Sequence, residues 1–464
     1  MGTFLIYSQT LISELLKNVP FVPLRKWEKE GKMNYIEARN YILEKEKLGS
    51  VMGLESIREL LKRMGNPEKN TPAVHIAGTN GKGSIMAYVE ETFVKTGMTV
   101  GRYISPTIYD YRERWRKNKE WASEEDVARA ITAVSKRVDA MIADGLPSPT
   151  AFEIETAAAF WLFDDWKCDI MLIECGMGGR MDATNVLEGD VLNVLAPISL
   201  DHMSILGKNL QEITREKLGI VRDKTVLVTA PQADEVMTEI MKYAVEHKVK
   251  LIQADTEELV INEESYHSAS FTYKGEDYDI SMGGKYQIEN AITAIEVLKY
   301  FKDVCEDFIY MGLLTTVWDG RFSVVHKEPM VIIDGAHNEK AWTSLRASLE
   351  KYFTNEKFIF IMGVFRDKEY PKMIETLSPL IEKVYTVASD NPRSIPAKEL
   401  ASIFEESGVK SAPADSVEDA IEAAMEEAKA NKTGELSGKA SRIVICGTLS
   451  ITGDALRYFK EYIT

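Results

Sequence analysis

The chain has 464 residues, 45% of which are hydrophobic, and a formal net charge of −16. This length and composition predict a globular protein with two domains, and the acidic balance argues against general binding to nucleic acid or to an anionic membrane surface. No run approaches the ~20 apolar residues of a membrane span, and we see no export signal near the N-terminus.

Residues 1–32 are expected to form an N-terminal extension with a short amphipathic segment at residues 11–16, and Met33 is an alternative start. The four cysteines show neither a C-x-x-C pair nor a metal-ligand spacing, and they stand in apolar sequence. This pattern favours reduced thiols in the core and a cytoplasmic location. The cysteines are Cys168, Cys175, Cys305 and Cys446.

From residue 34 to about residue 254, strand-like apolar runs alternate with helical patterns, which predicts parallel βαβ units. Residues 258–282 change character and indicate a small antiparallel hairpin, followed by a helix at residues 286–301. The predicted strands of this part are residues 73–77, 100–104, 170–174, 191–195 and 226–228.

After a join near residues 303–319 the alternation restarts, which predicts a second α/β domain. The glutamate- and alanine-rich segment at residues 416–429 is most simply a helix with a solvated face. The predicted strands are residues 331–333, 358–362, 384–387 and 443–445. We therefore expect an extension, a first domain, a linker and a second, smaller domain at residues 1–32, 33–305, 306–319 and 320–464.

A glycine-rich loop with the sequence HIAGTNGKGS, residues 75–84, joins the first predicted strand to a helical pattern. Its glycines let backbone N–H groups converge on an anion, Lys82 adds a positive charge, and Ser84 offers a hydroxyl to a metal at the helix N-terminus. The spacing departs from a regular Walker A motif, because Gly83 separates the lysine from the serine. A plain glycine-rich turn is the alternative, but the lysine and serine favour a nucleotide site.

Polar residues follow three predicted strands, and parallel strands bring such ends to one edge of a sheet. Oxygen ligands such as Ser84, Ser105 and Glu174 suit Mg²⁺, with His202 as a less usual participant. Taken singly, Ser105 is equally an N-cap, Glu174 a salt-bridged surface residue, and His202 a loop histidine. Their joint position beside the phosphate loop favours a metal site.

Three further segments allow either a structural or a functional interpretation. Lys217 stands on a charged helical pattern and is by default a solvated lysine. The glutamates after Thr150 are either first-turn dipole partners or pocket groups. Asp334, at the end of a strand, suits a ribose hydroxyl and Arg321 suits a phosphate, although an N-cap and a surface charge explain them as well.

Seven motifs taken in order resemble the signature of the folylpolyglutamate synthase/dihydrofolate synthase family, which is similar to the Mur ligases. They are HIAGTNGKGS (75–84), ECGMGGRMDATNV (174–186), LDH (200–202), EKLGI (216–220), YQIENA (286–291), GRF (320–322) and DGAHN (334–338). The resemblance runs from about Met33 to the C-terminus. It implies a Mur-ligase-like α/β fold, in which a P-loop ATPase domain with a mostly parallel sheet and a small antiparallel β element precedes a smaller Rossmann-like glutamate-ligase domain.

The resemblance also implies roles for single residues in binding ATP and Mg²⁺. The ATP phosphates are assigned to Asn80, Gly81, Lys82, Gly83 and Ser84. Two Mg²⁺ ions are assigned to Ser84, Ser105, Glu174 and His202. The adenine, a phosphate, the ribose and the transferred phosphoryl group are assigned to Asn290, Arg321, Asp334 and His337. Lys82, Lys217 and His337 would take part in catalysis.

Two more expectations concern Lys217 and the pterin. Lys217 matches a lysine that the family carboxylates to a carbamate, which requires a lowered lysine pKa because only a neutral amine reacts with CO₂. The pterin pocket is assigned to Thr150, Ala151, Phe152, Glu153, Met181, Asp182 and Ala183. This chain departs from the family pattern at Thr107, where a histidine is frequent, and at Glu339, where a proline is frequent.

The implied reaction is ATP-driven addition of L-glutamate to dihydropteroate or tetrahydrofolate through an acyl phosphate, releasing ADP and phosphate in folate biosynthesis. The expected partners are these small molecules alone, without nucleic acid or membrane, and the expected state is a monomer. A Mur ligase acting on a UDP-muramyl peptide is the alternative enzyme. A nucleotide-gated binding protein without turnover is the alternative from another class.

Overall fold

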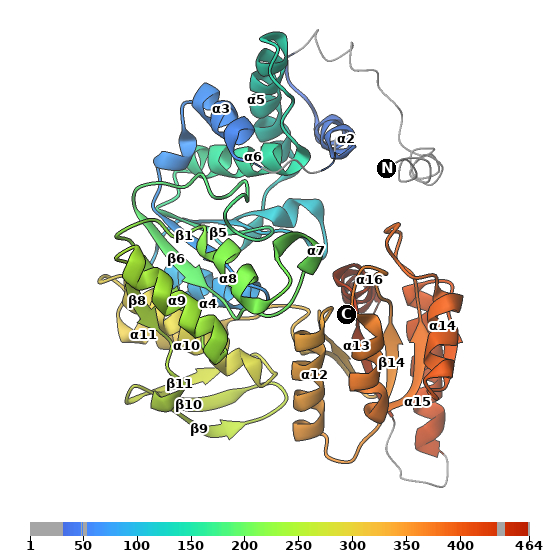
Figure 1. Ribbon diagram of the computed structural model, residues 1–464. Coiled ribbons are helices and arrows are strands. Elements are labelled where there is room, and N and C mark those ends of the chain that lie inside the picture. The colour runs from blue at the N-terminus through green and yellow to red at the C-terminus, as the bar shows by residue number, and fades with distance from the viewer. Residues whose placement is uncertain (1–30, 48, 50–52, 434–440, 463–464) are drawn as a thin grey trace.

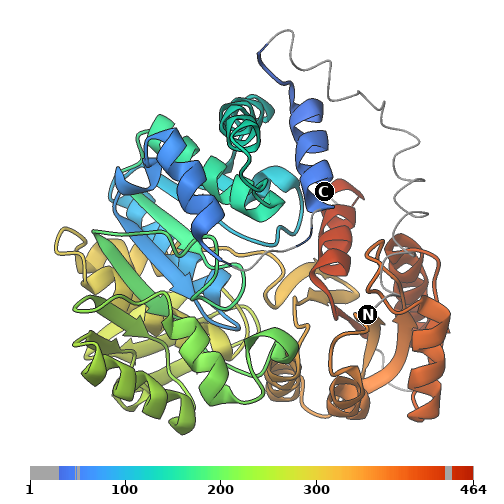
Figure 2. The same cartoon turned by 45° about the horizontal axis from the view of Figure 1, so that its top comes forward.

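The computed structural model describes residues 31–47, 49, 53–433 and 441–462. A larger α/β domain and a smaller one, built from the C-terminal part of the chain, stand side by side (Figures 1 and 2). Within the described residues no helix is long and apolar enough to cross a membrane. The amphipathic segment expected at residues 11–16 lies outside the described residues.

The larger domain is built on an eight-stranded sheet in the order β4-β3-β2-β5-β1-β6-β7-β8. Six strands of this sheet run parallel, as predicted, and they are β2, β5, β1, β6, β7 and β8. The other two, β3 and β4, add an antiparallel edge beside β2. The predictions at residues 73–77, 170–174 and 191–195 are confirmed at both limits. The strands are β1 (Ala73–Ala77), β2 (Val100–Tyr103), β3 (Trp115–Lys117), β4 (Glu120–Trp121), β5 (Ile170–Glu174), β6 (Val191–Leu195), β7 (Val226–Thr229) and β8 (Lys250–Gln253).

Helices cover both faces of this sheet, because successive side chains of a buried strand point to opposite sides. Ile170 and Leu172 of β5 pack with α4, α10 and α11, whereas Met171 and Ile173 pack with α2, α3, α5 and α6. The helices are α2 (Tyr35–Glu46), α3 (Glu55–Met64), α4 (Lys82–Lys95), α5 (Glu124–Ala143), α6 (Ala151–Asp165), α7 (Met203–Leu206), α8 (Leu210–Leu218), α9 (Asp234–Glu246), α10 (Tyr286–Lys299) and α11 (Glu306–Thr315).

A small antiparallel sheet, ordered β11-β10-β9, confirms the predicted hairpin and adds a third strand to it. Phe271 and Tyr278 pack into the apolar cluster that also contains residues of α10. The third strand is largely exposed, so it carries no apolar alternation that predicts it. The strands are β9 (Leu259–Glu264), β10 (Ala269–Tyr273) and β11 (Glu276–Ile280).

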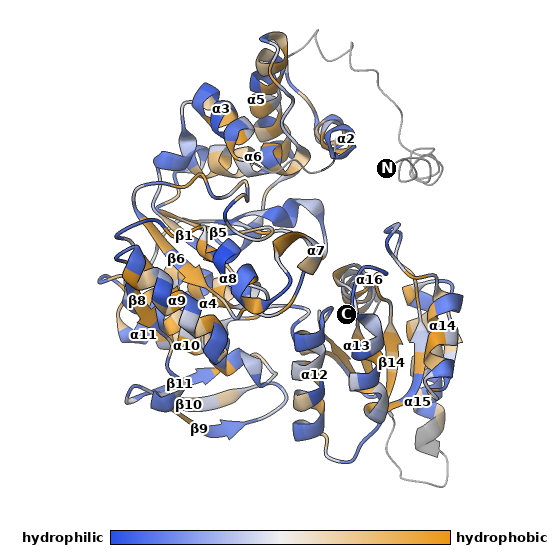
Figure 3. Cartoon of the chain, viewed as in Figure 1, coloured by the Kyte–Doolittle hydropathy of each residue, from blue (hydrophilic) through white to orange (hydrophobic). Residues whose placement is uncertain are grey.

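The smaller domain holds a six-stranded sheet in the order β12-β13-β17-β14-β15-β16, parallel except for the edge strand β12. The central strand β14 is strongly hydrophobic (Figure 3), and the four inner strands β13, β17, β14 and β15 are those that the sequence predicted. The elements are β12 (Ser323–Lys327), β13 (Met330–Ile333), α12 (Glu339–Tyr352), β14 (Phe358–Met362), α13 (Tyr370–Leu377), β15 (Ile381–Thr386), α14 (Ala397–Glu406), β16 (Ser411–Pro413), α15 (Val417–Thr433), β17 (Arg442–Cys446) and α16 (Leu449–Tyr462).

Two details differ from the simplest interpretation of the sequence, and a third confirms it. The helix α11 lies within the stretch expected as a linker and packs on α4, where Gly312 stands against Thr92. The acidic helix α15 has one solvated face, as predicted, while Ile421 on its other face packs against the sheet. Cys305 is exposed, which makes its assignment to the core wrong, while the other three cysteines are buried thiols. The domain limits stay a prediction.

Candidate active site

A cavity of about 500 Å³ is lined by residues of both domains. It gathers every residue predicted to bind ATP or Mg²⁺, together with the three predicted catalytic residues. These are Asn80, Gly81, Lys82, Gly83, Ser84, Ser105, Glu174, His202, Lys217, Asn290, Arg321, Asp334 and His337. Side chains far apart in the sequence, from both sheets, therefore face one space.

The phosphate loop joins the end of β1 to the start of α4. Gly78 has a φ of 150° and stands so close to Ala196 that a Cβ there would lie 2.6 Å from the alanine Cβ. Gly81, with a φ of 85°, precedes α4 without a side-chain cap, so the first N–H groups of the helix are open to a ligand. Open N–H groups at a helix N-terminus attract an anion. Lys82 Nζ donates to the carbonyl oxygens of Gly78 at 3.2 Å and Thr79 at 3.3 Å, and lies 3.7 Å from Glu174 Oε1.

The expected metal ligands differ in their surroundings. Ser84 Oγ is buried and has no hydrogen-bond partner in the part of the chain that the structure describes. Burial raises the pKa of the Glu174 carboxyl, although the charges of Lys82, Arg102 and Arg321 oppose this rise. His202 has a φ of 49° and a side chain that is 41% exposed. No group of three or more His, Cys, Asp and Glu side chains forms a ligand cluster within the described residues.

Lys217 is buried, contrary to the default interpretation of its charged helix. Its side chain reaches from α8 under the phosphate loop, where Nζ donates to the Gly78 carbonyl at 2.9 Å. Burial and the nearby charge of Lys82 lower the pKa of Lys217 to about 8. The amine is therefore neutral in a large fraction of molecules at mildly alkaline pH.

The smaller domain supplies the opposite wall of the cavity. Asp334 is buried and accepts hydrogen bonds from Tyr286 Oη at 2.6 Å, from the N–H of Phe322 at 2.9 Å and from the N–H of Ala336 at 2.9 Å. His337 Nδ1 lies 2.8 Å from the Gly335 carbonyl, and burial lowers the pKa of His337 to about 4. This histidine is therefore neutral at physiological pH.

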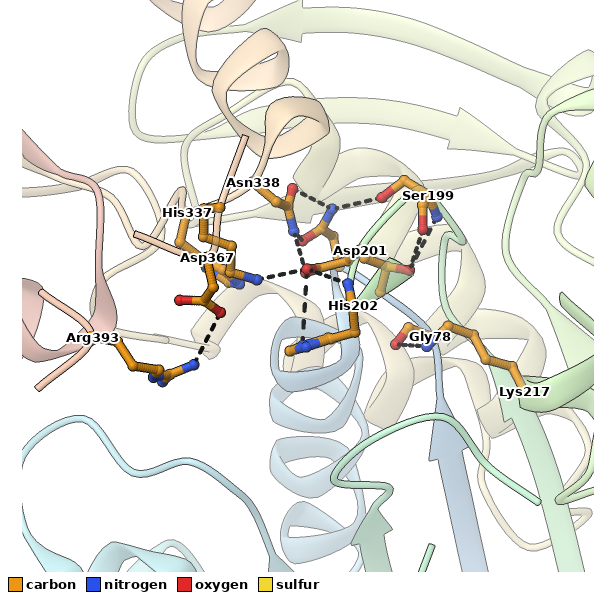
Figure 4. Close-up of polar contacts among 12 residues, drawn as sticks. Gly78, Ser199, Asp201, His202, Lys217, His337, Asn338, Asp367 and Arg393 are labelled. Atoms are coloured by element: carbon orange, nitrogen blue, oxygen red, sulfur yellow. Dashed lines mark hydrogen bonds and ion pairs between the residues drawn. The ribbon is translucent and has the colours of Figure 1, made fainter. Parts of the chain in front are cut away.

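A polar network that the sequence analysis missed crosses the domain boundary (Figure 4). Asp201 accepts from Lys368 Nζ at 2.6 Å and from Asn338 Nδ2 at 3.1 Å, and Asn338 Nδ2 also donates to Asn80 Oδ1 at 3.1 Å. Burial raises the pKa of Asp201, but the Lys368 ammonium outweighs it and holds that pKa well below its usual range. These partners are 137 to 258 residues apart, so no local pattern could have found them.

The seven residues expected in a pterin pocket do not line this cavity. Thr150 and Glu153 cap α6 through reciprocal hydrogen bonds, and Met181 is exposed. Asp182 accepts from the N–H groups of Met177 at 2.8 Å and Thr184 at 3.0 Å, and so holds the glycine-rich loop after β5. The remaining members are Ala151, Phe152 and Ala183, of which the two alanines are buried.

Known protein families match both domains. The Mur ligase middle domain matches residues 76–298, and the glutamate ligase domain of the Mur ligases matches residues 320–440. With the phosphate loop on one wall of the cavity and the smaller domain on the other, the fold and site define an ATP-dependent ligase of the Mur ligase class.

Individual relatives narrow this class. The dihydrofolate synthase/folylpolyglutamate synthase of Bacillus subtilis is 33% identical over 378 residues, covering 79% of this chain and 88% of that protein. The chain therefore belongs to the dihydrofolate synthase/folylpolyglutamate synthase family. Mycobacterium tuberculosis folylpolyglutamate synthase complexed with ADP has a TM-score of 0.84 at 26% identity, covering 92% of this chain and 99% of that one. Escherichia coli FolC in complex with DHPP and ADP has a TM-score of 0.79 at 28% identity, covering 92% and 98%.

Proposed function

We propose that this ligase adds L-glutamate to dihydropteroate and to a reduced folate. The observation that carries the proposal is the cavity, in which the phosphate loop, Glu174 and Lys217 face Arg321 and His337. The family, the ADP bound to the M. tuberculosis enzyme and the DHPP bound to the E. coli enzyme support it. ATP would pass its γ-phosphoryl group to the substrate carboxylate, and the glutamate amine would displace phosphate from the acyl phosphate.

The chain would act mainly by positioning and by charge neutralisation, as in other phosphoryl transfers. The open N–H groups of the loop and Lys82 would hold the phosphates, and Arg321 would neutralise charge from the other domain. Asn290, whose amide stands beside Gly81, would contact the adenine. Among the described residues, Asp334 Oδ1 accepts one hydrogen bond, from the N–H of Ala336, so it keeps a lone pair for a ribose hydroxyl.

The residues present fit a magnesium site. The Ser84 hydroxyl has no partner among the described residues, and the Glu174 carboxylate in the same cavity is desolvated. Mg²⁺ prefers one or two carboxylates, waters and substrate phosphates. Ser84, Ser105, Glu174 and His202 would hold the ions. Bound Mg²⁺ would neutralise charge on the phosphates.

Lys217 would act as a carbamate rather than as an ammonium ion. The neutral Nζ lone pair would attack the carbon of CO₂, forming an N–C bond, and the nitrogen would release a proton to leave an anion. The lowered pKa and the burial of this lysine support the step. Mass spectrometry after mild trapping would find the carbamate. Its absence, with full activity in Lys217→Ala, would remove this role.

The pterin would lie beside the cavity, behind the glycine-rich loop that follows β5. Phe152 packs so closely on Gly176 that a Cβ on the glycine would lie 2.6 Å from the ring, and Gly176 itself lines the cavity. A small movement of this aromatic ring would therefore open the cavity towards Thr150, Glu153 and Asp182. We assign these residues, with Ala151, Met181 and Ala183, to the pterin pocket on that basis.

Two further proposals concern the oligomeric state and the cellular compartment. We propose a monomer as the active state. Cys168, Cys175 and Cys446 are free buried thiols, which supports a reducing compartment such as the cytoplasm.

The deciding experiment measures glutamate-dependent ADP release with dihydropteroate, a reduced folate and a UDP-muramyl peptide in parallel. We expect release with the first two substrates and none with the third. Release only with the muramyl peptide would replace the proposal with a Mur ligase, and ADP binding without release on any substrate would leave a binding protein.

A further inference from the structure

Trp318 lies in the short stretch that joins α11 to β12, yet its indole packs on the larger domain. The Arg102 guanidinium stands 4.4 Å from the centre of the ring. Arg102 is 1% exposed and is fixed by an ion pair with Glu90 at 2.7 Å, while its Nε and Nη2 have no hydrogen-bond partner among residues 31–47, 49, 53–433 and 441–462. A guanidinium in this state interacts favourably with an aromatic face.

The edge of the same indole lies against the phosphate loop. A Cβ placed on Gly83 would come within 2.9 Å of Trp318 Nε1, 3.2 Å of Cζ2 and 3.3 Å of Cε2, and these are its three nearest atoms. Gly83 lines the cavity, whereas Trp318 does not. The indole therefore occupies the space behind the loop, between its backbone and the arginine.

The residue that follows Trp318 is bonded to both domains. Asp319 accepts from Lys460 Nζ on α16 of the smaller domain at 2.9 Å, and from Tyr109 Oη of the larger domain at 2.6 Å. The position of the smaller domain and the position of the indole are thus linked through one peptide bond.

We propose that Trp318 is a positioning residue that ties the conformation of the phosphate loop to the docking of the smaller domain. When that domain moves away, the linker withdraws the indole from Gly83, and the loop loses the support that keeps its N–H groups aligned. The proposal rests on the proposed function only in taking the loop as the nucleotide site.

The test compares Trp318→Leu with Trp318→Phe, which keeps an aromatic ring over Arg102. We expect the leucine variant to raise the Kd for ADP and the KM for ATP about tenfold, with kcat and the KM for glutamate changed less than about twofold. A looser loop weakens binding of ground and transition states alike, and saturating ATP restores the rate. The phenylalanine variant should recover most of the affinity.

Trp161 offers a matched control, because Arg129 stands 5.5 Å over its ring on the opposite face of the sheet. Trp161→Leu should leave nucleotide affinity unchanged. Unchanged ADP affinity in Trp318→Leu, or an equal loss in Trp161→Leu, would overturn the proposal. A thermal unfolding scan of each variant accompanies the titrations.

A spectroscopic arm covers the case in which the leucine variant does not fold. ADP should change the intrinsic fluorescence of the unmodified chain and of Trp161→Phe, and this change should be absent in Trp318→Phe. A full signal in Trp318→Phe contradicts the link. This titration needs neither glutamate nor folate, so a failure of ligation in the parallel assay is distinguishable from a failure here.

The contact itself is tested by a double-mutant cycle. Gly83→Ala should weaken ADP binding by pushing against the indole, and Gly83→Ala with Trp318→Leu should be no weaker than Trp318→Leu alone. Strictly additive losses would mean that the two residues act independently.

Discussion

At the scale of single residues, two charged groups of the cavity act on one another across a short distance. Lys82 Nζ lies 3.7 Å from Glu174 Oε1, and both side chains are largely buried. Bound phosphate would compete for the lysine, and a metal ion for the carboxylate, so this pair describes the site before its ligands arrive. Each partner is then free to hold charge that develops during the reaction.

We predict that Lys82→Ala and Glu174→Ala each slow the reaction at least a hundredfold. Loss of one well-placed charge donor raises a barrier by roughly 3 kcal/mol, and in a water-poor cavity no solvent dipole replaces it. Steady-state ADP release with saturating substrates measures the effect. Near-normal turnover in either variant would remove that residue from the site.

A buried histidine beneath the site carries a second prediction at this scale. His75 Nε2 lies 2.8 Å from Thr184 Oγ1, and that hydroxyl donates to Asp182 Oδ1 at 2.6 Å. Because the Thr184 hydroxyl proton already points to Asp182, the Nε2–H of His75 is the donor to Thr184 Oγ1, as in a neutral imidazole. Burial, with a smaller contribution from Arg222, lowers the pKa of His75 to about 3.

The unfolded chain binds a proton at His75 below about pH 6.5, whereas the folded chain does not until about pH 3. Stability from this residue is therefore present at neutral pH and lost as the pH falls. Between pH 7 and pH 5 the loss is about 2 kcal/mol. Urea unfolding of the unmodified chain and of His75→Gln at both pH values measures it. An equal pH dependence in both chains would contradict this assignment.

At the scale of elements, the loop after β5 docks on α8 through a glycine contact. A Cβ on Gly179 would lie 2.6 Å from the Glu216 carbonyl oxygen and 2.9 Å from Lys217 Cα. Both are backbone atoms, which cannot rotate away. The close approach of loop and helix is what places the Lys217 side chain under the phosphate loop.

We predict that Gly179→Ala displaces α8 and lowers activity at least tenfold, with a loss of stability of about 1–3 kcal/mol from overpacking. Gly275→Ala is the control, because its turn has a φ of 85° but open space around it. That variant should lose about 1 kcal/mol of stability and keep its activity. Thermal unfolding and ADP release separate the two effects, and full activity in Gly179→Ala would show that α8 tolerates the shift.

The elements also show what the sequence can and cannot predict. Buried central strands such as β1, β5 and β14 are mostly apolar runs that end at polar residues or glycine, and their limits were predicted to the residue. The strands β4, β9 and β16 are short or exposed edges, so their conformation depends on a neighbouring strand rather than on their own residues. Motif residues of the site were found because their types and spacing are local.

Contacts across the domain boundary had no such signal. Lys368 follows a strand, and no motif around it distinguishes it from a solvated lysine. Lys217 stands on a helix rich in charged residues, so the sequence favoured a solvated side chain there. The packing of the two domains brings Lys368 to Asp201, and Lys217 is buried where α8 meets the loop after β5.

At the scale of the whole molecule, the pair between Asp201 and Lys368 is predicted to hold the domains together. Both side chains are about nine-tenths buried, and breaking such a pair by removing one partner costs about 3 kcal/mol. We expect Lys368→Met to destabilise the docked arrangement of the two domains relative to an open one. Small-angle X-ray scattering should then give a larger radius of gyration. Lys372→Met, an exposed neighbour on α13, is the control. An identical scattering curve for both variants would show that other contacts suffice.

The position of α11 sets a limit on such an opening. Because this helix is packed on α4, only residues 316–322 are left to connect the two domains, and a chain of that length spans at most about 25 Å. The halves of the cavity therefore stay at a high effective concentration with respect to each other even when apart. Re-docking is a first-order process that dilution of the protein leaves unchanged, and a severed smaller domain supplied in solution would meet a far lower local concentration.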